Sequence, residues 1–219
     1  MIDRITAKGL VRSFGRARIL REVNASFGAG RVHALVGANG SGKTTFLRVL
    51  AGLLGFERGV LEYGPIQIVS GGPMEWPLKR KIAYLGHESF AYPQLSGREN
   101  LKFACDLYGS DNKKIEEILD RYQLLRAADR PLSTYSRGMV QRTALARVQI
   151  QDPDILLLDE PTTGLDTQTH RIVLEDIRDA SAKGRIVIVV SHDPRDLEEL
   201  GGYLYRIDRG RISLDEANN

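Results

Sequence analysis

The stretch of the sequence with the most specific chemistry is residues 37–44, which read Gly-Ala-Asn-Gly-Ser-Gly-Lys-Thr. This spacing fits the phosphate-loop pattern G-x-x-x-x-G-K-[ST], in which the backbone N–H groups of a strand-to-helix loop converge on an anion. Lys43 would add a positive charge for the outer phosphates, and the Thr44 hydroxyl could ligate Mg²⁺. The alternative is a glycine-rich turn that binds nothing. The residues expected to bind the phosphates are Gly37, Asn39, Gly40, Ser41, Gly42, Lys43, Thr44 and Thr45.

A second group of reactive side chains follows two apolar runs. Asp159 and Glu160 come directly after residues 155–158, and His192 lies just beyond residues 186–190. Since ligands bind at the carboxyl ends of parallel strands, Asp159 is expected to hold the metal through water. Glu160 is expected to act as the general base that takes a proton from the attacking water. His192 could hydrogen-bond the γ-phosphate or position Glu160. For Asp159 and Glu160, the alternative is the end of a strand that runs out into solvent. For His192, the alternative is a structural role.

An aromatic residue near the start of the chain is a further candidate. Phe14 lies among polar and glycine neighbours in the stretch Arg-Ser-Phe-Gly-Arg at residues 12–16. An aromatic ring at such a place could stack on a nucleotide base. An ordinary packed or half-exposed phenylalanine is the alternative.

These residues need a parallel sheet to bring them together. Unbroken apolar runs predict buried strands, and stripes of apolar residues at helical spacing follow residues 45 and 166. Alternation of strands and helices favours a twisted, mostly parallel sheet that is covered on both faces. The predicted fold class is therefore α/β, a P-loop NTPase with a mostly parallel core sheet. Its expected core strands are residues 32–36, 82–85, 155–158 and 186–190.

Around this core the sequence predicts antiparallel strands and a helical lobe. From about residue 89 to 150 the apolar spacing is helical, and Asp111 is expected to cap the second helix there. We therefore expect one domain over residues 1–219, whose α/β core and small antiparallel subdomain comprise residues 1–88 and 151–219. The expected antiparallel strands are residues 2–8 and 19–27, joined through 12–16, then 60–63 and 66–69; residues 71–77 are expected to form a loop, and 203–207 with 211–214 a terminal hairpin.

Composition narrows the classes of function. The net charge of the 219 residues is only +3, with acidic and basic residues interleaved, so a nucleic-acid partner is not expected. The apolar runs are strand-sized, and residues 1–5 lack the apolar core of a signal peptide, so we expect a cytoplasmic chain. Cys105 is the single cysteine, which excludes an internal disulfide, and its spacing predicts a packed core thiol.

Residues 132–142, Leu-Ser-Thr-Tyr-Ser-Arg-Gly-Met-Val-Gln-Arg, resemble the signature segment of ATP-binding-cassette ATPases. Ser136 and Gly138 match the signature serine and its second glycine. Residues 164–166, Gly-Leu-Asp, resemble the D-loop of the same family, and residues 191–193, Ser-His-Asp, its switch histidine segment. The resemblance covers essentially the whole chain. It implies that the nucleotide is ATP, and it places Phe14 where the family has an adenine-stacking aromatic residue.

The resemblance also implies how these motifs work together. Family members are head-to-tail dimers in which two ATP molecules lie between the phosphate loop of one copy and the signature of the other. Ser136 and Gly138 begin a helix whose N–H groups would then face the partner's nucleotide. The expected partners are a second copy, or a similar ATPase, and a membrane permease that docks on the helical lobe and residues 87–95. The permease would hold the chain at the inner face of the cell membrane.

Two segments depart from the family pattern. Where the family has a glutamine after residues 82–85, this chain has His87 and then Glu88. His87 could hydrogen-bond there and contact the metal, or Glu88 could approach the metal. In the signature, Arg137 replaces the first glycine and Met139 the usual glutamine. The Ser-Arg-Gly-Met form is similar to exporter-like branches, which include drug-export and haem-export (cytochrome c maturation) ATPases, and the Gly-His turn favours the haem-export type.

The sequence therefore predicts the ATP-hydrolysing subunit of a membrane transporter. The alternative within the family is a soluble ATPase that acts on nucleic acid or the ribosome. Such proteins usually carry tandem cassettes or coiled-coil insertions, and neither is evident in this sequence. A P-loop kinase or G-protein-like switch would explain residues 37–44 but neither the segment 136–142 nor His192.

Overall fold

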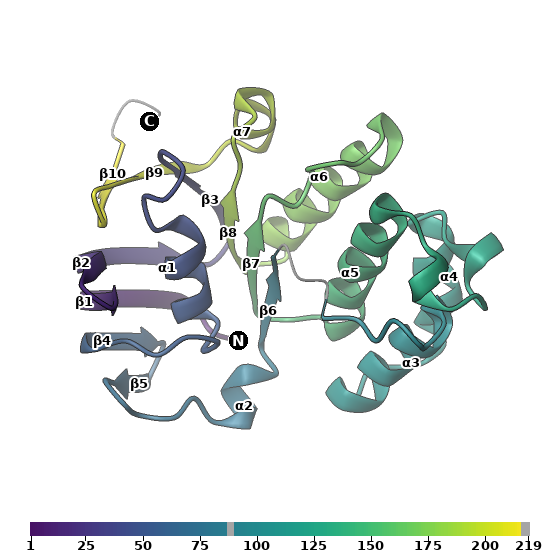
Figure 1. The fold of residues 1–219 in the computed structure, drawn as a ribbon, viewed down its shortest axis with the longest axis horizontal. Coiled ribbons are helices and arrows are strands. Elements are labelled where there is room, and N and C mark those ends of the chain that lie inside the picture. Colours follow the sequence, from purple (N-terminus) through teal and green to yellow (C-terminus); the bar gives the residue numbers. More distant parts are fainter. Residues whose placement is uncertain (87–89, 216–219) are drawn as a thin grey trace.

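A central sheet of mostly parallel strands organises the chain (Figure 1). The computed structural model describes residues 1–86 and 90–215. Each pairing in this sheet is parallel except that of β9 with β10. This arrangement confirms the predicted α/β class. In spatial order the strands are β10 (Arg211–Leu214), β9 (Tyr203–Asp208), β3 (Arg31–Val36), β8 (Ile186–Val190), β7 (Ile155–Asp159) and β6 (Ile82–Leu85).

A second sheet is antiparallel and packs beside the first. Its strands, in spatial order, are β2 (Ala17–Gly28), β1 (Arg4–Phe14), β4 (Arg58–Tyr63) and β5 (Ile66–Val69). The prediction that residues 12–16 join β1 to β2 was wrong. Phe14 still pairs with Ala17, so only Gly15 and Arg16 form the turn. Backbone pairing continues through this polar stretch because ladder hydrogen bonds do not depend on apolar side chains.

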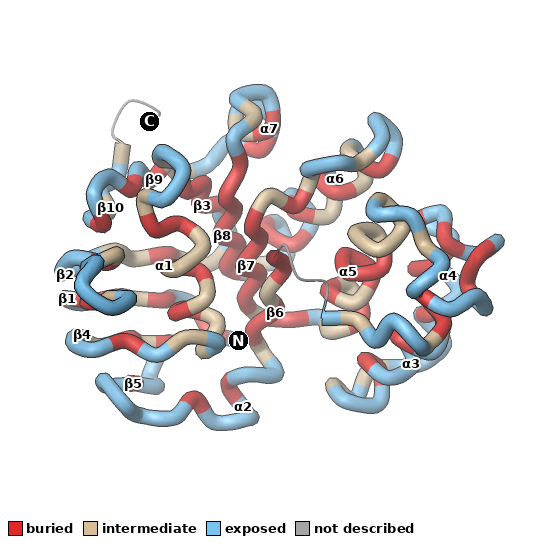
Figure 2. Tube along the Cα trace, in the orientation of Figure 1, coloured by how far each residue is buried: buried red, intermediate tan, exposed pale blue. Residues whose placement is uncertain are grey.

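Helices cover both faces of the central sheet. Alternate side chains of β7 and β8 enter opposite cores, as strand geometry requires. One core contains α1 and the antiparallel sheet, and the other contains α3, α4, α5 and α6. Figure 2 shows the buried central strands between these layers. The remaining bounds are α1 (Lys43–Leu50), α2 (Trp76–Lys79), α3 (Gly97–Tyr108), α4 (Lys114–Arg121), η1 (Leu125–Ala127), η2 (Leu132–Thr134), α5 (Arg137–Gln151), α6 (Thr167–Ala182) and α7 (Pro194–Leu200).

Two local predictions were wrong. The expected loop at residues 71–77 ends in α2, which begins at Trp76 and has Pro77 in its first turn, where proline is favoured. The Trp76 ring stacks on Tyr108 with the centroids 6.1 Å apart. Asp111 does not cap α4; Lys113 stands at that position, and Asp111 Oδ1 accepts a hydrogen bond from the Lys113 N–H at 2.9 Å. Aspartate makes such a turn just before a helix as readily as a cap.

The prediction for the single cysteine was confirmed, since Cys105 is buried, at 1% exposure. The last helix, α7, begins with Asp193 as its cap and Pro194 as its first residue. In the described part of the chain, none of the helices has both the length and the apolarity to span a bilayer.

The hairpin of β9 and β10 is held against β2 by a glycine. Gly210 has φ +77°, and a Cβ there would lie 2.2 Å from the carbonyl oxygen of Ile19. The Arg21 N–H donates to the Gly210 carbonyl at 2.8 Å. The same hairpin supports the phosphate loop, because a Cβ at Gly37 would lie 2.3 Å from the carbonyl oxygen of Ile207. The fold therefore needs the absence of a side chain at Gly210 for close packing as well as for its backbone angle.

We expect Gly210→Ala to destabilise the chain more than Gly30→Ala. Gly30 has the same φ of +77°, but nothing lies within 4 Å of its would-be Cβ. Left-handed strain alone should cost Gly30→Ala about 1 kcal/mol, or roughly 2–4 °C in melting temperature. Gly210→Ala should lose about 1–3 kcal/mol more, because backbone must move. Thermal unfolding followed by circular dichroism measures both; equal shifts would contradict the packing argument.

Candidate active site

The residues singled out for their chemistry line one cavity of about 770 Å³. It is bounded by the end of β1, the phosphate loop, and the carboxyl ends of β7 and β8. Gly37 and Ser41 belong to the loop without lining the cavity. Sequence reasoning missed Ile19 and Thr163, which carry no distinguishing motif. The residues around the cavity are Phe14, Ile19, Asn39, Gly40, Gly42, Lys43, Thr44, Thr45, Asp159, Glu160, Thr163 and His192.

The phosphate loop directs the positive end of α1 into this cavity. Gly40 and Gly42 have φ values of +78° and +113°, which side chains rarely adopt, so the turn depends on glycine here. Gly42 is the N-cap of α1, and the first turn of the helix contains no acidic residue. The helix dipole and free N–H groups therefore favour an anion at this position.

Lys43 is buried within its own loop, at 7% exposure. Its Nζ donates to the carbonyl oxygens of Gly37 at 2.7 Å and Ala38 at 3.0 Å. Burial lowers the pKa of Lys43, whereas the negative charges of Glu160 and Asp159 act in the opposite direction. The ammonium group is thus already held inside the turn that would surround the phosphates.

Thr44 and Asp159 meet across the two elements that carry them. Thr44 Oγ1 donates to Asp159 Oδ2 at 2.6 Å, and Asp159 is 3% exposed. A hydroxyl and a carboxylate are oxygen ligands of the kind that Mg²⁺ prefers. Within residues 1–86 and 90–215, no cluster of three or more His, Cys, Asp or Glu side chains could hold a metal. The residues present therefore fit an ion that takes few protein ligands and completes its shell with water and phosphate oxygens.

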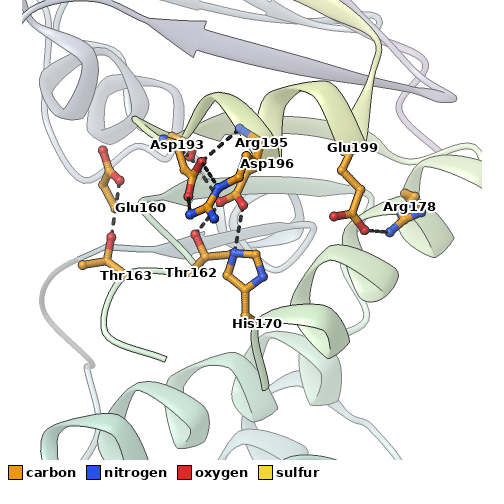
Figure 3. A network of polar contacts seen from close by, with 10 residues as sticks. Glu160, Thr162, Thr163, His170, Arg178, Asp193, Arg195, Asp196 and Glu199 are labelled. Carbon is orange, nitrogen blue, oxygen red and sulfur yellow. Dashed lines mark hydrogen bonds and ion pairs between the residues drawn. The ribbon is translucent and has the colours of Figure 1, made fainter. Parts of the chain in front are cut away.

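Glu160 and His192 form a close pair at the edge of the central sheet. His192 Nε2 lies 3.0 Å from Glu160 Oε1; the glutamate side chain is 16% exposed and the imidazole 49%. Thr163 Oγ1 donates to the other oxygen, Oε2, at 3.4 Å (Figure 3). Glu160 has φ +54°, a strained conformation for a residue with a side chain. A largely buried carboxylate with an imidazole at hydrogen-bond distance can accept and pass on a proton.

Phe14 lines the cavity near the end of β1. The residue is 49% exposed, and the Arg12 guanidinium lies 4.8 Å from the ring centroid. An exposed aromatic ring at the wall of the cavity can stack on a planar base.

Ser136 and Gly138 lie away from the phosphate loop of their own chain. Ser136 is the exposed N-cap of α5, and its Oγ accepts from the Met139 N–H at 3.3 Å. Arg137 lines a neighbouring cavity of about 300 Å³ that also reaches Asp159 and Glu160. The described residues of one chain therefore do not bring Ser136 to the 770 Å³ cavity. His87 and Glu88, whose roles the sequence left open, lie outside the described residues.

Comparison with known proteins identifies the family. The family model for ABC transporters matches residues 20–163, more than half of the chain. The lantibiotic transport ATP-binding protein SrtF of Streptococcus pyogenes is 32% identical over 211 residues, which cover 95% of this chain and 89% of SrtF. The daunorubicin resistance ATP-binding protein DrrA2 of Streptomyces coeruleorubidus is 32% identical over 217 residues, which cover 97% of this chain and 66% of DrrA2.

A solved structure has the same fold. The dimeric post-hydrolysis structure of the ATP-binding cassette MJ0796, bound to ADP and phosphate, superimposes with a TM-score of 0.85. It covers 98% of this chain and 99% of that one at 23% identity. The phosphate loop, the acidic pair and His192 thus occur on an ABC ATPase fold, and the chain belongs to the ABC transporter family.

Proposed function

We propose that this chain is the ATP-binding and ATP-hydrolysing subunit of an ABC transporter that energises export through a separate membrane permease. The observation that carries the proposal is that Lys43, Thr44, Asp159, Glu160 and His192 all line one cavity. That cavity has an anion-binding half, made by the loop and α1, and an acidic half, made by the ends of β7 and β8. The names of SrtF and DrrA2 favour a drug or peptide exporter over the haem-export type.

The geometry supports hydrolysis with Glu160 as the general base. In the proposed step a water oxygen bonds to the γ-phosphorus while its proton moves to the Glu160 carboxylate. The bond from the γ-phosphorus to the β–γ bridging oxygen breaks, and ADP and phosphate leave. His192, 3.0 Å from Glu160, orients the carboxylate and can donate to the γ-phosphate. Lys43 binds the outer phosphates throughout.

Magnesium would be held by the two side chains that already meet. Thr44 would ligate Mg²⁺ directly and Asp159 through water. Their oxygens are 2.6 Å apart in this structure, so one ion can be held by both. When bound, the ion neutralises charge on the β- and γ-phosphates. Phe14 would hold the adenine by stacking.

Ser136 and Gly138 are proposed to serve the nucleotide of a second copy. They begin a 15-residue helix whose first turn has no acidic residue, so its positive end is uncompensated. They lie outside their own chain's cavity, and the related cassette MJ0796 was solved as a dimer bound to ADP and phosphate. A head-to-tail pair, of two copies or with a similar ATPase, would complete each site.

An exposed apolar surface is proposed to receive the permease. Leu53, Trp76 and Phe90 are 53%, 46% and 47% exposed, and all three line a separate cavity of about 310 Å³ between α1, α2 and α5. Exposed aromatic and aliphatic side chains gathered around a hollow are typical of protein interfaces. Docking there would place the chain at the cytoplasmic face of the membrane.

We expect Glu160→Gln to retain ATP binding and lose hydrolysis by at least about 100-fold, because an amide cannot take the proton. The ATP-bound dimer should then accumulate. Equilibrium binding of a fluorescent ATP analogue, phosphate release and size-exclusion chromatography with ATP measure the three effects. Turnover at the wild-type rate would remove Glu160 from the role of base.

Lys43→Ala is the contrasting variant for that experiment. Loss of the ammonium group should weaken nucleotide binding itself, since a charge-assisted contact to phosphate is lost. If both variants failed in the same way, the separation of a binding half from an acidic half would be refuted.

We expect Leu53→Asp to abolish co-purification of the chain with its permease from detergent-solubilised membranes. A charge in the apolar surface would have to be desolvated on docking. Val69→Asp is the matched control, because Val69 is 56% exposed but lies in β5, outside both the helical lobe and the 310 Å³ cavity. Retention of the permease by Leu53→Asp, or its loss in both variants, would contradict this docking surface.

A further inference from the structure

A buried carboxylate behind the active site joins the segments that carry its reactive residues. Asp196 lies in the first turn of α7, and its side chain is 2% exposed. Its Oδ2 accepts hydrogen bonds from Thr162 Oγ1 at 2.7 Å and Ser191 Oγ at 3.4 Å. Its Oδ1 lies 2.8 Å from His170 Nε2 on α6. Figure 3 shows Thr162 and His170 pointing toward Asp196 from different elements.

Contacts within α7 do not offset the free-energy cost of burying the Asp196 carboxylate. An ionised group without water is tolerated only when it is paired and hydrogen-bonded. The start of α7 is already capped by Asp193, whose side chain accepts from the Arg195 N–H at 2.9 Å. Asp196 Oδ2 instead accepts hydrogen bonds from two other segments, and its Oδ1 lies beside His170 of a third. Its contacts are therefore between elements and not within its own helix.

Two of the residues that bond to Asp196 lie close in the sequence to Glu160 and His192. Thr162 is two residues after Glu160, and Ser191 directly precedes His192. One carboxylate thus holds the turn that follows β7 and the end of β8 at the same point. The distance between Glu160 and His192 depends on how these two segments are placed relative to one another.

The backbone of Glu160 gives a reason for such an anchor. A left-handed φ of +54° is strained for a residue with a side chain, and it persists only when the surroundings hold it. Before the strained residue, the chain is fixed by the sheet, and the Glu160 N–H donates to the Val190 carbonyl at 2.9 Å. After it, the side-chain bond from Thr162 to Asp196 is a fixed point only two residues away.

We propose that Asp196 is a positioning residue for hydrolysis, which acts through Thr162 and Ser191 to hold Glu160 against His192. His170 completes the arrangement, because its Nε2 lies 2.8 Å from the second oxygen of the buried carboxylate. This inference rests on the proposed ATPase function, and it adds Asp196, Thr162 and His170 to the residues on which the rate depends. None of the three needs to touch the nucleotide.

The decisive variant is Thr162→Val, which removes the hydroxyl donor and preserves the side-chain shape. We expect kcat to fall about 10- to 100-fold, because a displacement of the base by about 1 Å is enough for such a loss. The Kd for a non-hydrolysable ATP analogue should stay within about twofold, because the phosphate loop is untouched. Thr162→Ser, which keeps the hydroxyl, should recover most of kcat.

Glu199→Gln is the matched control on the same pair of helices. Glu199 on α7 makes an ion pair with Arg178 on α6, both about half exposed, and Figure 3 shows this pair apart from Asp196. Its loss should leave kcat and Kd unchanged. Asp196→Asn is a second probe: the amide has one acceptor oxygen and one NH2 group, so it cannot replace both carboxylate oxygens, and kcat should fall with little change in Kd.

The results separate this inference from the proposed function. If the wild-type chain does not hydrolyse ATP, the proposed function fails. If the wild type hydrolyses ATP and Thr162→Val keeps its kcat, the positioning role of Asp196 is refuted. The role is also refuted if Thr162→Ser is as impaired as Thr162→Val, or if kcat falls only in proportion to a loss of folded protein measured by circular dichroism.

Discussion

Parallel pairing in register at the carboxyl end of β8 is the constraint on which the site depends. Val190, the last residue of β8, pairs with Leu35 of β3 on one side and with Asp159 of β7 on the other. The three strands therefore end at one level, and the segments that leave them meet. The phosphate loop follows β3, Glu160 follows β7 and His192 lies just beyond β8. A shift of one residue in either pairing would separate the anion-binding loop from the acids.

The charged side chains of the site have partners within the chain. Lys43 donates to loop carbonyls, and Asp159 accepts from Thr44. The positive end of α1 faces the same cavity as Asp159 and Glu160, so the loop attracts an anion while the acids oppose one that lacks its metal. This combination suits a magnesium-bound triphosphate better than a bare phosphate.

Much of the fold could be predicted from the sequence because the buried strands consist of unbroken apolar runs. The runs at 155–158 and 186–190 form β7 and β8, and Asp159, Glu160 and His192 lie at the carboxyl ends of these strands, as predicted. Prediction failed where pairing overrides local composition, as in the polar end of β1, and where a proline that reads as a loop signal begins a short helix, as in α2.

The network around Asp196 could not be predicted for a different reason. Asp196 is 34 residues from Thr162 and five from Ser191 in the sequence, and these residues meet only through the tertiary fold. Residues 193–199 look like an ordinary polar helix start, and nothing in the residue type of Glu160 indicates a positive φ. A site's reactive groups can be recognised by motif, whereas the groups that hold them in place depend on packing.

Mixing two inactive variants tests most directly the claim that two copies share each ATP. Ser136→Arg should block the tip of α5, and Lys43→Ala the phosphate loop, so each variant alone has no intact site. In a head-to-tail dimer of one copy of each, one site combines the intact loop with the intact serine. The account predicts that an equimolar mixture regains up to about a quarter of wild-type ATPase activity, since half of the dimers are mixed and each has one good site. No recovery on mixing would show that Ser136 does not serve the partner's nucleotide, and the shared-site mechanism would be wrong.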